Sequence, residues 1–306
     1  MASLKSKLKI GKKIGEGCFG EVFLGIDPVH GDVAVKLIAR DPAETPAEWQ
    51  TRKAGLLHEA QRLKQATHRN VVRVHHLVEG SKGETIQYVM DYCPQGSLQS
   101  QYEGGPMKLG RLRVIAIDVI NGLAALHTQS MLHRDIKPSN ILLSDGGAAQ
   151  LGDFGLATDK LVLGYASRQG YSDHVAPEVH AGGGTSVKTD IWALGMTIYR
   201  LAHGEGWYSE SPPPIVLIPT GGFADQLRWL PHIPKKWRRF IRKMLRDDPA
   251  QRYQTAAEVL TDAGQLPTLE WKCTVSATEI RWRRSKGSRK IHVVWQRHSE
   301  RKHEWR

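Results

Sequence analysis

Four side chains in the middle of the chain combine the groups that phosphate chemistry requires. Asp135, Lys137 and Asn140 stand close together in the segment His-Arg-Asp-Ile-Lys-Pro-Ser-Asn, and Asp153 begins an Asp-Phe-Gly triplet further along. A carboxylate can accept the proton of an attacking hydroxyl, and an ammonium can neutralise a phosphate. Carboxylate and amide oxygens are ligands that Mg²⁺ prefers. The spacing therefore indicates transfer of a phosphoryl group.

A glycine-rich segment upstream is suited to covering phosphates. Residues 14–22 read Ile-Gly-Glu-Gly-Cys-Phe-Gly-Glu-Val, and glycines let backbone amides approach phosphate oxygens closely. Dinucleotide-binding folds and ordinary turns share this pattern. Strand-like residues on both sides favour a hairpin over the strand-then-helix of a dinucleotide-binding unit.

A positively charged side chain follows the glycine-rich segment at the end of an apolar, β-branched strand. Alone, Lys36 would read as a solvated charge at a strand edge, but after such a segment we expect it to bind phosphates. Helical spacing of apolar residues in 56–63 predicts a helix that turns Glu59 toward Lys36. The alternatives are that Glu59 is a surface residue or that Glu48 is the partner, although Pro46 makes residue 48 fit a helix start better.

In their order and spacing, these segments resemble the Hanks-type Ser/Thr protein kinase family over about residues 8–266. Ala-Pro-Glu at 176–178, Asp-Ile-Trp-Ala-Leu-Gly at 190–195 and Arg252 extend the resemblance. It implies an α+β, two-lobed fold with a small β-rich N-lobe and a large, mainly helical C-lobe. It also implies ATP with Mg²⁺, or alternatively Mn²⁺, as cofactors and protein hydroxyls as acceptors. No residue that the family requires for catalysis is missing.

The resemblance implies a role for each motif residue. Asp135 would be the general base, and Lys137 would neutralise the γ-phosphate and favour a Ser/Thr acceptor. The residues with implied roles in catalysis and metal binding are Asp135, Lys137, Lys36, Glu59, Asn140 and Asp153. The implied ATP-binding residues are Ile14, Gly15, Glu16, Gly17, Gly20, Val22, Ala34, Lys36, Met90, Asp91, Cys93, Ser97 and Leu142. Glu178 and Arg252 are expected to form a buried ion pair.

The segment before Ala-Pro-Glu departs from the family pattern. Tyr171 stands where the family has Thr, and His174 replaces the usual Tyr. These departures keep a small-molecule kinase open as an alternative. Arg134, just before the proposed base, implies activation by a phosphate in the activation loop. The candidate phosphosites are Ser167, Ser172 and Thr158.

The chain beyond Pro267 differs from the rest in charge and pattern. Residues 268–306 hold 11 Lys and Arg against 4 Asp and Glu, which is +7 of the net charge of +12. Apolar residues alternating with polar ones predict a small antiparallel meander or hairpin, with a turn at 285–288 and a frayed end at 297–306. The cations expected around the turn are Arg281, Arg283, Arg284, Lys286, Arg289 and Lys290.

Three interpretations of this basic tail stay open. It is a solvated basic face, a nucleic-acid contact with stacking aromatics, or a docking surface for an acidic protein or a membrane. In the second case, the chain as a whole could be a nucleic-acid-binding regulator that uses its kinase fold as a sensor. The Pro-rich stretch at 212–214 is expected to be a connecting loop, with partner docking as the alternative.

Bulk properties limit the remaining possibilities. The 306 residues suffice for one two-lobed domain and a small appendage, which we divide into 1–92, 93–266 and 267–306. Three widely spaced cysteines indicate neither a disulfide framework nor a zinc site. Without a signal-peptide pattern or an apolar run long enough to span a bilayer, the sequence favours a cytoplasmic location.

Overall fold

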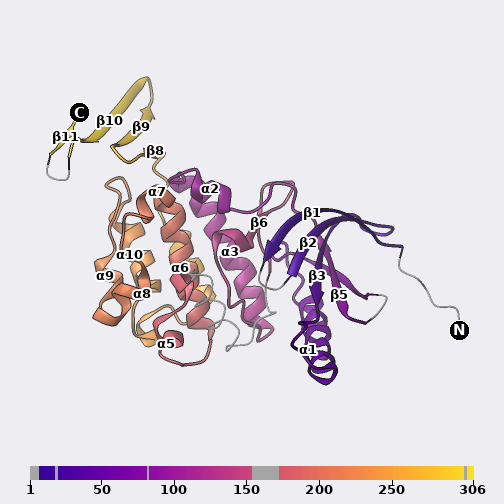
Figure 1. Cartoon of the computed structure of the whole chain (residues 1–306). Helices are drawn as coiled ribbons and strands as arrows, with labels where there is room; N and C mark the ends of the chain where they lie inside the picture. The colour runs from indigo at the N-terminus through magenta and orange to yellow at the C-terminus, as the bar shows by residue number, and fades with distance from the viewer. Residues whose placement is uncertain (1–6, 18–19, 81–82, 154–171, 300–301) are drawn as a thin grey trace, which may run out of the picture.

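The N-terminal part is built on an antiparallel sheet (Figure 1). The structure is a computed structural model that describes residues 7–17, 20–80, 83–153, 172–299 and 302–306, without the side chains of Glu59 and Ser172. The sheet order is β1-β2-β3-β5-β4. Its strands are β1 (Lys9–Gly17), β2 (Gly20–Asp27), β3 (Gly31–Ala39), β4 (Val74–Glu79) and β5 (Thr85–Asp91). Side chains of β3 are buried on both faces of the sheet, so this strand can hold Lys36 in a fixed place.

Helix α1 (Pro46–Gln65) packs against β4 and begins at a capping box. The Thr45 hydroxyl accepts from the Glu48 N–H, and the Glu48 carboxylate accepts from the Thr45 N–H (2.8 Å). Such a cap satisfies two of the free amides at a helix start. The Glu48 carboxylate is thus used at the cap, which supports the expectation that residue 48 belongs to a helix start.

The C-terminal part is mainly helical and is organised around α3 (Leu109–Thr128) and α6 (Val187–His203). Most of α6 is buried, and a two-stranded sheet of β6 (Ile141–Leu143) and β7 (Ala149–Leu151) lies at the junction with the N-terminal sheet. The other α-helices among the residues that the structure describes are α2 (Gln99–Glu103), α5 (Pro177–His180), α7 (Glu205–Tyr208), α8 (Pro214–Leu217), α9 (Phe223–Gln226), α10 (Lys235–Met244) and α11 (Ala256–Ala263).

A close approach inside α3 ties the two parts together. A Cβ on Gly122 would overlap the Asn70 carbonyl. That carbonyl accepts a hydrogen bond from the Leu151 N–H of β7 (2.9 Å). Glycine is therefore required in the middle of this helix despite its low helix propensity.

The tail forms a second antiparallel sheet in the order β11-β10-β9-β8. Its strands are β8 (Lys272–Val275), β9 (Glu279–Lys286), β10 (Arg289–Arg297) and β11 (His303–Trp305). The predicted meander and its turn, where Gly287 has φ 59°, are confirmed. The expectation that residues 297–306 fray is wrong for the described residues of this range, 297–299 and 302–306. β11 pairs with β10, and Trp305 stacks on Trp282 with ring centroids 5.7 Å apart, which gives the last strand an apolar anchor.

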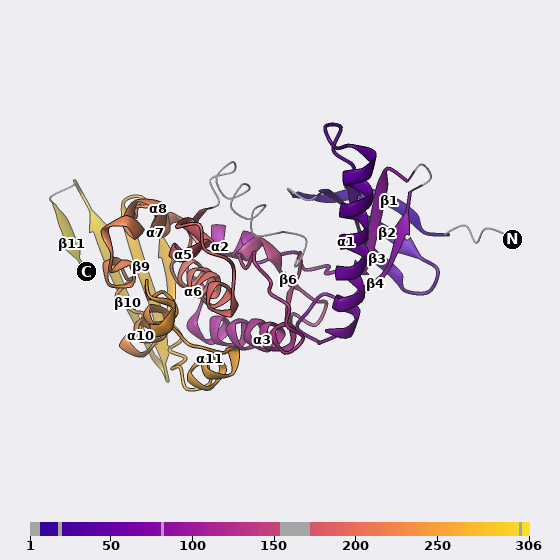
Figure 2. The same cartoon turned by 90° about the horizontal axis from the view of Figure 1, so that it is seen from below.

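Figures 1 and 2 place the tail sheet at the opposite end of the molecule from the N-terminal sheet. It is attached to the helical part by a hydrogen bond from Trp282 Nε1 to His232 Nδ1 (3.0 Å) and by one from Trp237 Nε1 to the Pro267 carbonyl (2.8 Å). The predicted α+β class, with a β-rich first part, a mainly helical second part and a β-rich extension, is confirmed. Among the residues described, no helix has the length and hydropathy needed to span a membrane.

Candidate active site

Three of the predicted catalytic side chains contact one another directly in the loop after α3. Asp135 Oδ2 accepts hydrogen bonds from Lys137 Nζ (2.7 Å) and from Asn140 Nδ2 (2.7 Å). Asn140 Nδ2 also donates to the Asp135 carbonyl (2.9 Å), and the short helix η1 (Pro138–Asn140) brings it back over that residue. Lys137 and Asn140 are each only 7% exposed. The carboxylate is thus fixed by two donors before any substrate arrives.

Asp190, in the first turn of α6, holds the backbone of the loop that contains Asp135. Its carboxylate, only 1% exposed, accepts from the backbone N–H groups of His133 (2.9 Å) and Arg134 (2.8 Å) and from His127 Nε2 (2.9 Å). Arg134 has φ 68°, a left-handed conformation that costs a non-glycine residue about 1–3 kcal/mol. The charged acceptor therefore holds the backbone in a strained shape immediately before Asp135.

His133 connects the catalytic loop to the segment that carries Asp153. Its Nδ1 accepts from the Asp135 N–H (3.3 Å), so its Nε2 carries the proton and donates to the Gly152 carbonyl (3.1 Å). Burial lowers the pKa of this imidazole, in keeping with the neutral form. His133 thereby fixes the position of the loop that carries Asp135 and Asn140 relative to the segment that carries Asp153.

Lys36 and Asp153 form an ion pair across the junction between the two parts of the molecule. Lys36 is 3% exposed on β3, and Asp153 follows Gly152 with φ 59°. Glu59, the predicted partner of Lys36, lies on α1, but its side chain falls outside the described part of the chain. Asp153 is thus one established partner of the Lys36 ammonium.

The predicted glycine-rich hairpin is present in β1 and β2. Gly15 pairs with Val22 and Gly17 with Gly20, while Val22 is also the cross-strand neighbour of Lys36. This register sets the hairpin beside the buried ammonium. Glu16 is bound by Lys13 Nζ at 2.6 Å, and Ile14 is 39% exposed.

The chain passes from the first part to the second through a hinge, residues 90–94, which contains Met90, Asp91 and Cys93 at and just after the end of β5. Met90 is the cross-strand neighbour of Ala34, and the Asp91 N–H donates to the Arg73 carbonyl (3.0 Å), so a contact to a base would fall to the Asp91 carbonyl. His75 Nε2 lies 2.9 Å from the Asp91 carboxylate. Burial raises the pKa of the Cys93 thiol to about 11, which keeps it protonated and unreactive.

Beyond the hinge, the chain returns to the junction through β6. Ser97 forms an isolated bridge with Leu142, and the Leu98 N–H donates to the Ile141 carbonyl (2.9 Å). A Cβ on Gly152 would lie 3.1 Å from Leu142 Cδ1. Leu142 therefore packs beside Gly152, the residue immediately before Asp153.

The donor set at this junction fits a hard divalent cation. Because both contacts of the Asn140 amide nitrogen go to Asp135, its oxygen Oδ1 faces away from that residue. The Asp153 carboxylate, whose Oδ1 pairs with Lys36, would offer a second oxygen ligand. Amide and carboxylate oxygens in small number match Mg²⁺, which completes its coordination with phosphates and water.

Glu178 and Arg252 form a bidentate ion pair. Arg252 Nη1 and Nη2 donate to the two carboxylate oxygens at 2.7 and 2.8 Å, and the guanidinium also donates to three main-chain carbonyls. Arg252 is fully buried at its side chain, whereas that of Glu178 is 24% exposed. The pair joins α5 to the loop before α11.

His174, one of the two departures from the family pattern, is buried in a polar network. Arg200 Nη1 donates to His174 Nε2 (2.7 Å), so the imidazole proton is on Nδ1, which faces the Ala193 carbonyl (3.4 Å). Burial, followed by the charge of Arg200, holds the pKa of His174 well below its usual range. Arg200 in turn lies over the rings of Tyr102 and Tyr208. Tyr171, Thr158 and Ser167 lie outside the described residues, as does the side chain of Ser172.

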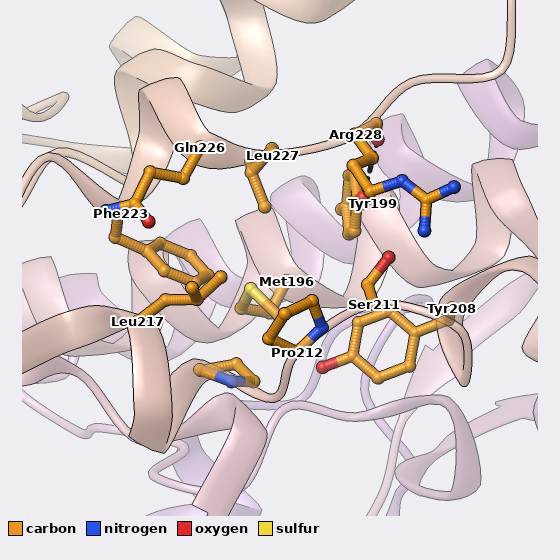
Figure 3. A pocket seen from close by; sticks show the side chains of 11 residues that line it. Met196, Tyr199, Tyr208, Ser211, Pro212, Leu217, Phe223, Gln226, Leu227 and Arg228 are labelled. Atoms are coloured by element: carbon orange, nitrogen blue, oxygen red, sulfur yellow. Dashed lines mark hydrogen bonds between the residues drawn. The ribbon is translucent and has the colours of Figure 1, made fainter.

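The Pro-rich stretch lines a small cavity between α6, α8 and α9 (Figure 3). Its volume is about 20 Å³, room for about one water molecule. Figure 3 shows Phe223, Met196 and Pro212 around it, with the Tyr208 hydroxyl nearby. This cavity cannot hold a nucleotide and lies apart from the residues described above.

The six tail cations do not form one cluster. Arg283, Arg284 and Lys290 line a common groove, whereas Arg281 is bound by Glu279 (2.7 Å). Lys286 and Arg289 face each other across the turn. Of the tryptophans, Trp282 is 3% exposed and Arg284 lies over Trp271, so these rings are not free for base stacking.

Sequence reasoning missed several positioning residues. Asp190 was recognised only as part of a motif, and no role was predicted for it. His127, which shares its carboxylate, and Arg200, which satisfies His174, gave no signal because single residues on amphipathic helices read as ordinary helix positions. Only folding brings them to the loops they support.

The chain matches the family described as Protein kinase domain over residues 8–263, more than half of its length. It is 31% identical over 260 residues to the human mitogen-activated protein kinase kinase kinase 3, covering 82% of this chain and 41% of that protein. It is 33% identical over 264 residues to the serine/threonine-protein kinase dst2 of Dictyostelium discoideum, covering 81% and 22%. It is 34% identical over 217 residues to the cytokinesis protein sepH of Aspergillus terreus, covering 70% and 15%.

Together, the fold and the match define a protein kinase domain. The chain belongs to the Hanks-type serine/threonine protein kinase family, as the sequence predicted. It spans half or less of the length of these curated relatives.

Proposed function

We propose that this chain is an ATP-dependent Ser/Thr protein kinase that transfers the γ-phosphoryl group to protein hydroxyls and phosphorylates itself. The observation that carries the proposal is the Asp135 carboxylate held by Lys137 and Asn140, across from the Lys36–Asp153 ion pair. An active site that needs positioning and charge neutralisation, rather than covalent chemistry, requires such a set.

Each side chain has a proposed task in the transfer. Asp135 orients the acceptor hydroxyl and takes its proton, while Lys137, 2.7 Å from that carboxylate, is close enough to neutralise the transferred group. Lys36 holds the α- and β-phosphates, and we keep Glu59 as its second partner. Bound Mg²⁺, or Mn²⁺ in its place, would neutralise charge on the phosphates, with Asn140 and Asp153 as its ligands.

The nucleotide would lie between the glycine-rich hairpin and β6. Backbone amides of the hairpin would cover the phosphates, and the Asp91 carbonyl and Cys93 amide would meet the base. The residues proposed to line this site are Ile14, Gly15, Glu16, Gly17, Gly20, Val22, Ala34, Met90, Asp91, Cys93, Ser97 and Leu142.

We propose a protein acceptor rather than a small molecule. Two features support a protein acceptor, the Glu178–Arg252 pair and the buried helix α6. Both fix the part of the C-terminal region that directly follows the activation segment. Regulation by a phosphate at Ser167, Ser172 or Thr158, read by Arg134, stays a proposal, as does the division into 1–92, 93–266 and 267–306. We also keep a cytoplasmic location as a proposal.

The tail is proposed to bind an anionic partner, nucleic acid or an acidic protein. Its excess of cations supports this general statement. A sensor function without catalysis is less favoured, since hydrogen bonds to Asp190 hold the catalytic loop in a strained shape.

The test is transfer of label from ATP to the chain itself and to dephosphorylated casein, in Mg²⁺ with and without chelator. Asp135→Asn is expected to lose at least 10²-fold in rate. The matched control is Asp32→Asn, the same change at an exposed position of β3, which should retain full activity. Equal labelling by the native chain and Asp135→Asn would refute the proposed base. Labelling of small-molecule alcohols but not of protein would favour the alternative acceptor.

A further inference from the structure

A groove with a volume of about 380 Å³ lies where the tail sheet meets the start of α3. The groove is distant from the proposed nucleotide site. Figures 1 and 2 both show the helical part between the tail sheet and the N-terminal sheet. The residues that line the groove are Lys108, Glu270, Lys272, Arg283, Arg284, Ser285, Lys290 and His292. Five of these eight are Lys or Arg, and one is acidic.

The strand register collects these cations from residues far apart in the sequence. Lys272 on β8 and His292 on β10 are both cross-strand neighbours of Arg283 on β9, and Lys290 is the neighbour of Ser285. Directly opposed side chains in a sheet have Cβ atoms about 4.5–5.5 Å apart, and like charges there are destabilising. An anion in the groove would relieve this repulsion.

The groove cations are not neutralised by the protein. Within the described residues, no ion pair involves Lys108, Lys272, Arg283, Arg284 or Lys290, whereas other cations of the tail do have carboxylate partners. Glu270, the single acidic residue of the lining, lies against Gly110 in the first turn of α3. Not counting His292, the lining therefore has a formal charge of +4.

We propose that this groove binds a compact ligand carrying two or more adjacent phosphoryl groups. Each phosphate monoester carries about −1.5 to −2 at neutral pH, so two of them balance the charge of the lining. The volume falls within the range of small-ligand sites. The guanidinium group of Arg283, whose cross-strand neighbours are Lys272 and His292, offers a planar, bidentate donor for phosphate oxygens.

The structure favours this ligand over an extended nucleic acid. A strand of nucleic acid would use the turn cations and the aromatic rings of the tail. Lys286 and Arg289 are outside the groove lining, Trp282 is buried, and Arg284 lies over Trp271. The exposed Trp305 is on β11, which contributes no residue to the groove lining. The positive charge is concentrated in one groove and does not follow an extended path along the surface of the tail sheet.

The experiment measures binding of inorganic tripolyphosphate to the full chain by titration calorimetry in 0.1 M NaCl without divalent cations. We expect one saturable site. Arg283→Glu and Lys272→Glu should each weaken binding by roughly tenfold or more, and Glu270→Gln should tighten it by roughly twofold to fivefold. Lys286→Glu makes the same charge change at the turn, outside the groove, and should shift the affinity by no more than about twofold.

Two further arms identify the site and the source of the phosphates. Lys36→Met removes the ammonium proposed to hold ATP phosphates and should leave the measured affinity within about twofold, so this test does not depend on the kinase proposal. A peptide with two adjacent phosphoserines, compared with its unphosphorylated form, shows whether a modified protein supplies the ligand. Absence of saturable binding, or equal weakening by Lys286→Glu and Arg283→Glu, would overturn the proposal. Tighter binding of a 20-residue oligothymidylate, weakened equally by both changes, would replace it with a nucleic-acid surface.

Discussion

Replacing Asp190 by asparagine tests whether the shape of the catalytic loop depends on a single buried carboxylate. This carboxylate accepts three hydrogen bonds, two at Oδ2 from His127 and the His133 N–H and one at Oδ1 from the Arg134 N–H. An amide of the same shape keeps one oxygen acceptor and turns an NH₂ group toward at least one of these donors. The change therefore removes at least one hydrogen bond. It also places two donors against each other, the new amide NH₂ and the group that donated to the carboxylate.

The magnitude follows from this geometry. A hydrogen bond to a charged group contributes about 1.5–3 kcal/mol, and a buried donor without a partner adds about 1–3 kcal/mol. We expect the unfolding free energy to fall by about 2.5–6 kcal/mol. For a chain of 306 residues, that corresponds to a decrease in Tm of roughly 4–9 °C. Since the left-handed conformation of Arg134 costs about 1–3 kcal/mol, the loop should also relax in the folded protein and move Asp135.

The assay combines thermal unfolding with steady-state kinetics. A displacement of about 1 Å in a catalytic group costs on the order of 10²-fold in rate, so kcat should fall at least tenfold while KM for ATP changes little. Asp225→Asn is the matched control, because this exposed carboxylate pairs with Arg246 on the surface and should change Tm by less than about 2 °C. A Tm within 2 °C and a kcat within twofold of the native values in Asp190→Asn would refute the reasoning. A lower Tm with native kcat would limit the carboxylate to a stabilising role.

Three other changes test the packing and protonation described above. Burial lowers the pKa of His203 to about 3. Below pH 6.5 the imidazole is therefore protonated in the unfolded state but not in the folded state. The unfolding free energy should fall by about 1.4 kcal/mol per pH unit as the pH decreases from 6 to 4. In His203→Leu, urea unfolding across this range should show a slope smaller by about that amount, and an unchanged slope would contradict the assignment. Gly122→Ala should destabilise despite a gain in helix propensity, whereas Gly55→Ala in α1, with open space around it, should stabilise by about 0.5–1 kcal/mol; equal effects in denaturation would refute the predicted overlap. Glu178→Gln should cost about 3 kcal/mol or more in unfolding free energy because it leaves the buried Arg252 uncompensated, and a loss under 1 kcal/mol would contradict this view of the pair.

The fold class could be predicted from the sequence because motifs and periodicity are local signals. Period-two alternation predicted the tail meander, and the glycine turn predicted the hairpin of β1 and β2. The pairing of β11 was missed, since a short charged segment gives no periodicity signal and is held by the stacking of Trp305 on Trp282.

The candidate site divides in the same way. Asp135, Lys137 and Asn140 lie within six positions, so the sequence itself brings their side chains within reach of one another. The contact of Lys36 with Asp153 joins residues 117 positions apart, and only the strand register and the junction between the two parts determine it. The same is true of Asp190, which acts on a loop 56–57 positions away.

The sequence by itself therefore determined the chemistry, because the reacting groups of this family stand in short motifs. Their side chains are only a few positions apart, so the local backbone brings them together. Only the tertiary structure decided which groups position them and where the excess charge is concentrated. Buried hydrogen bonds such as those to Asp190, and the opposition of Lys272, Arg283 and His292 across three strands, depend on distances that no local pattern encodes.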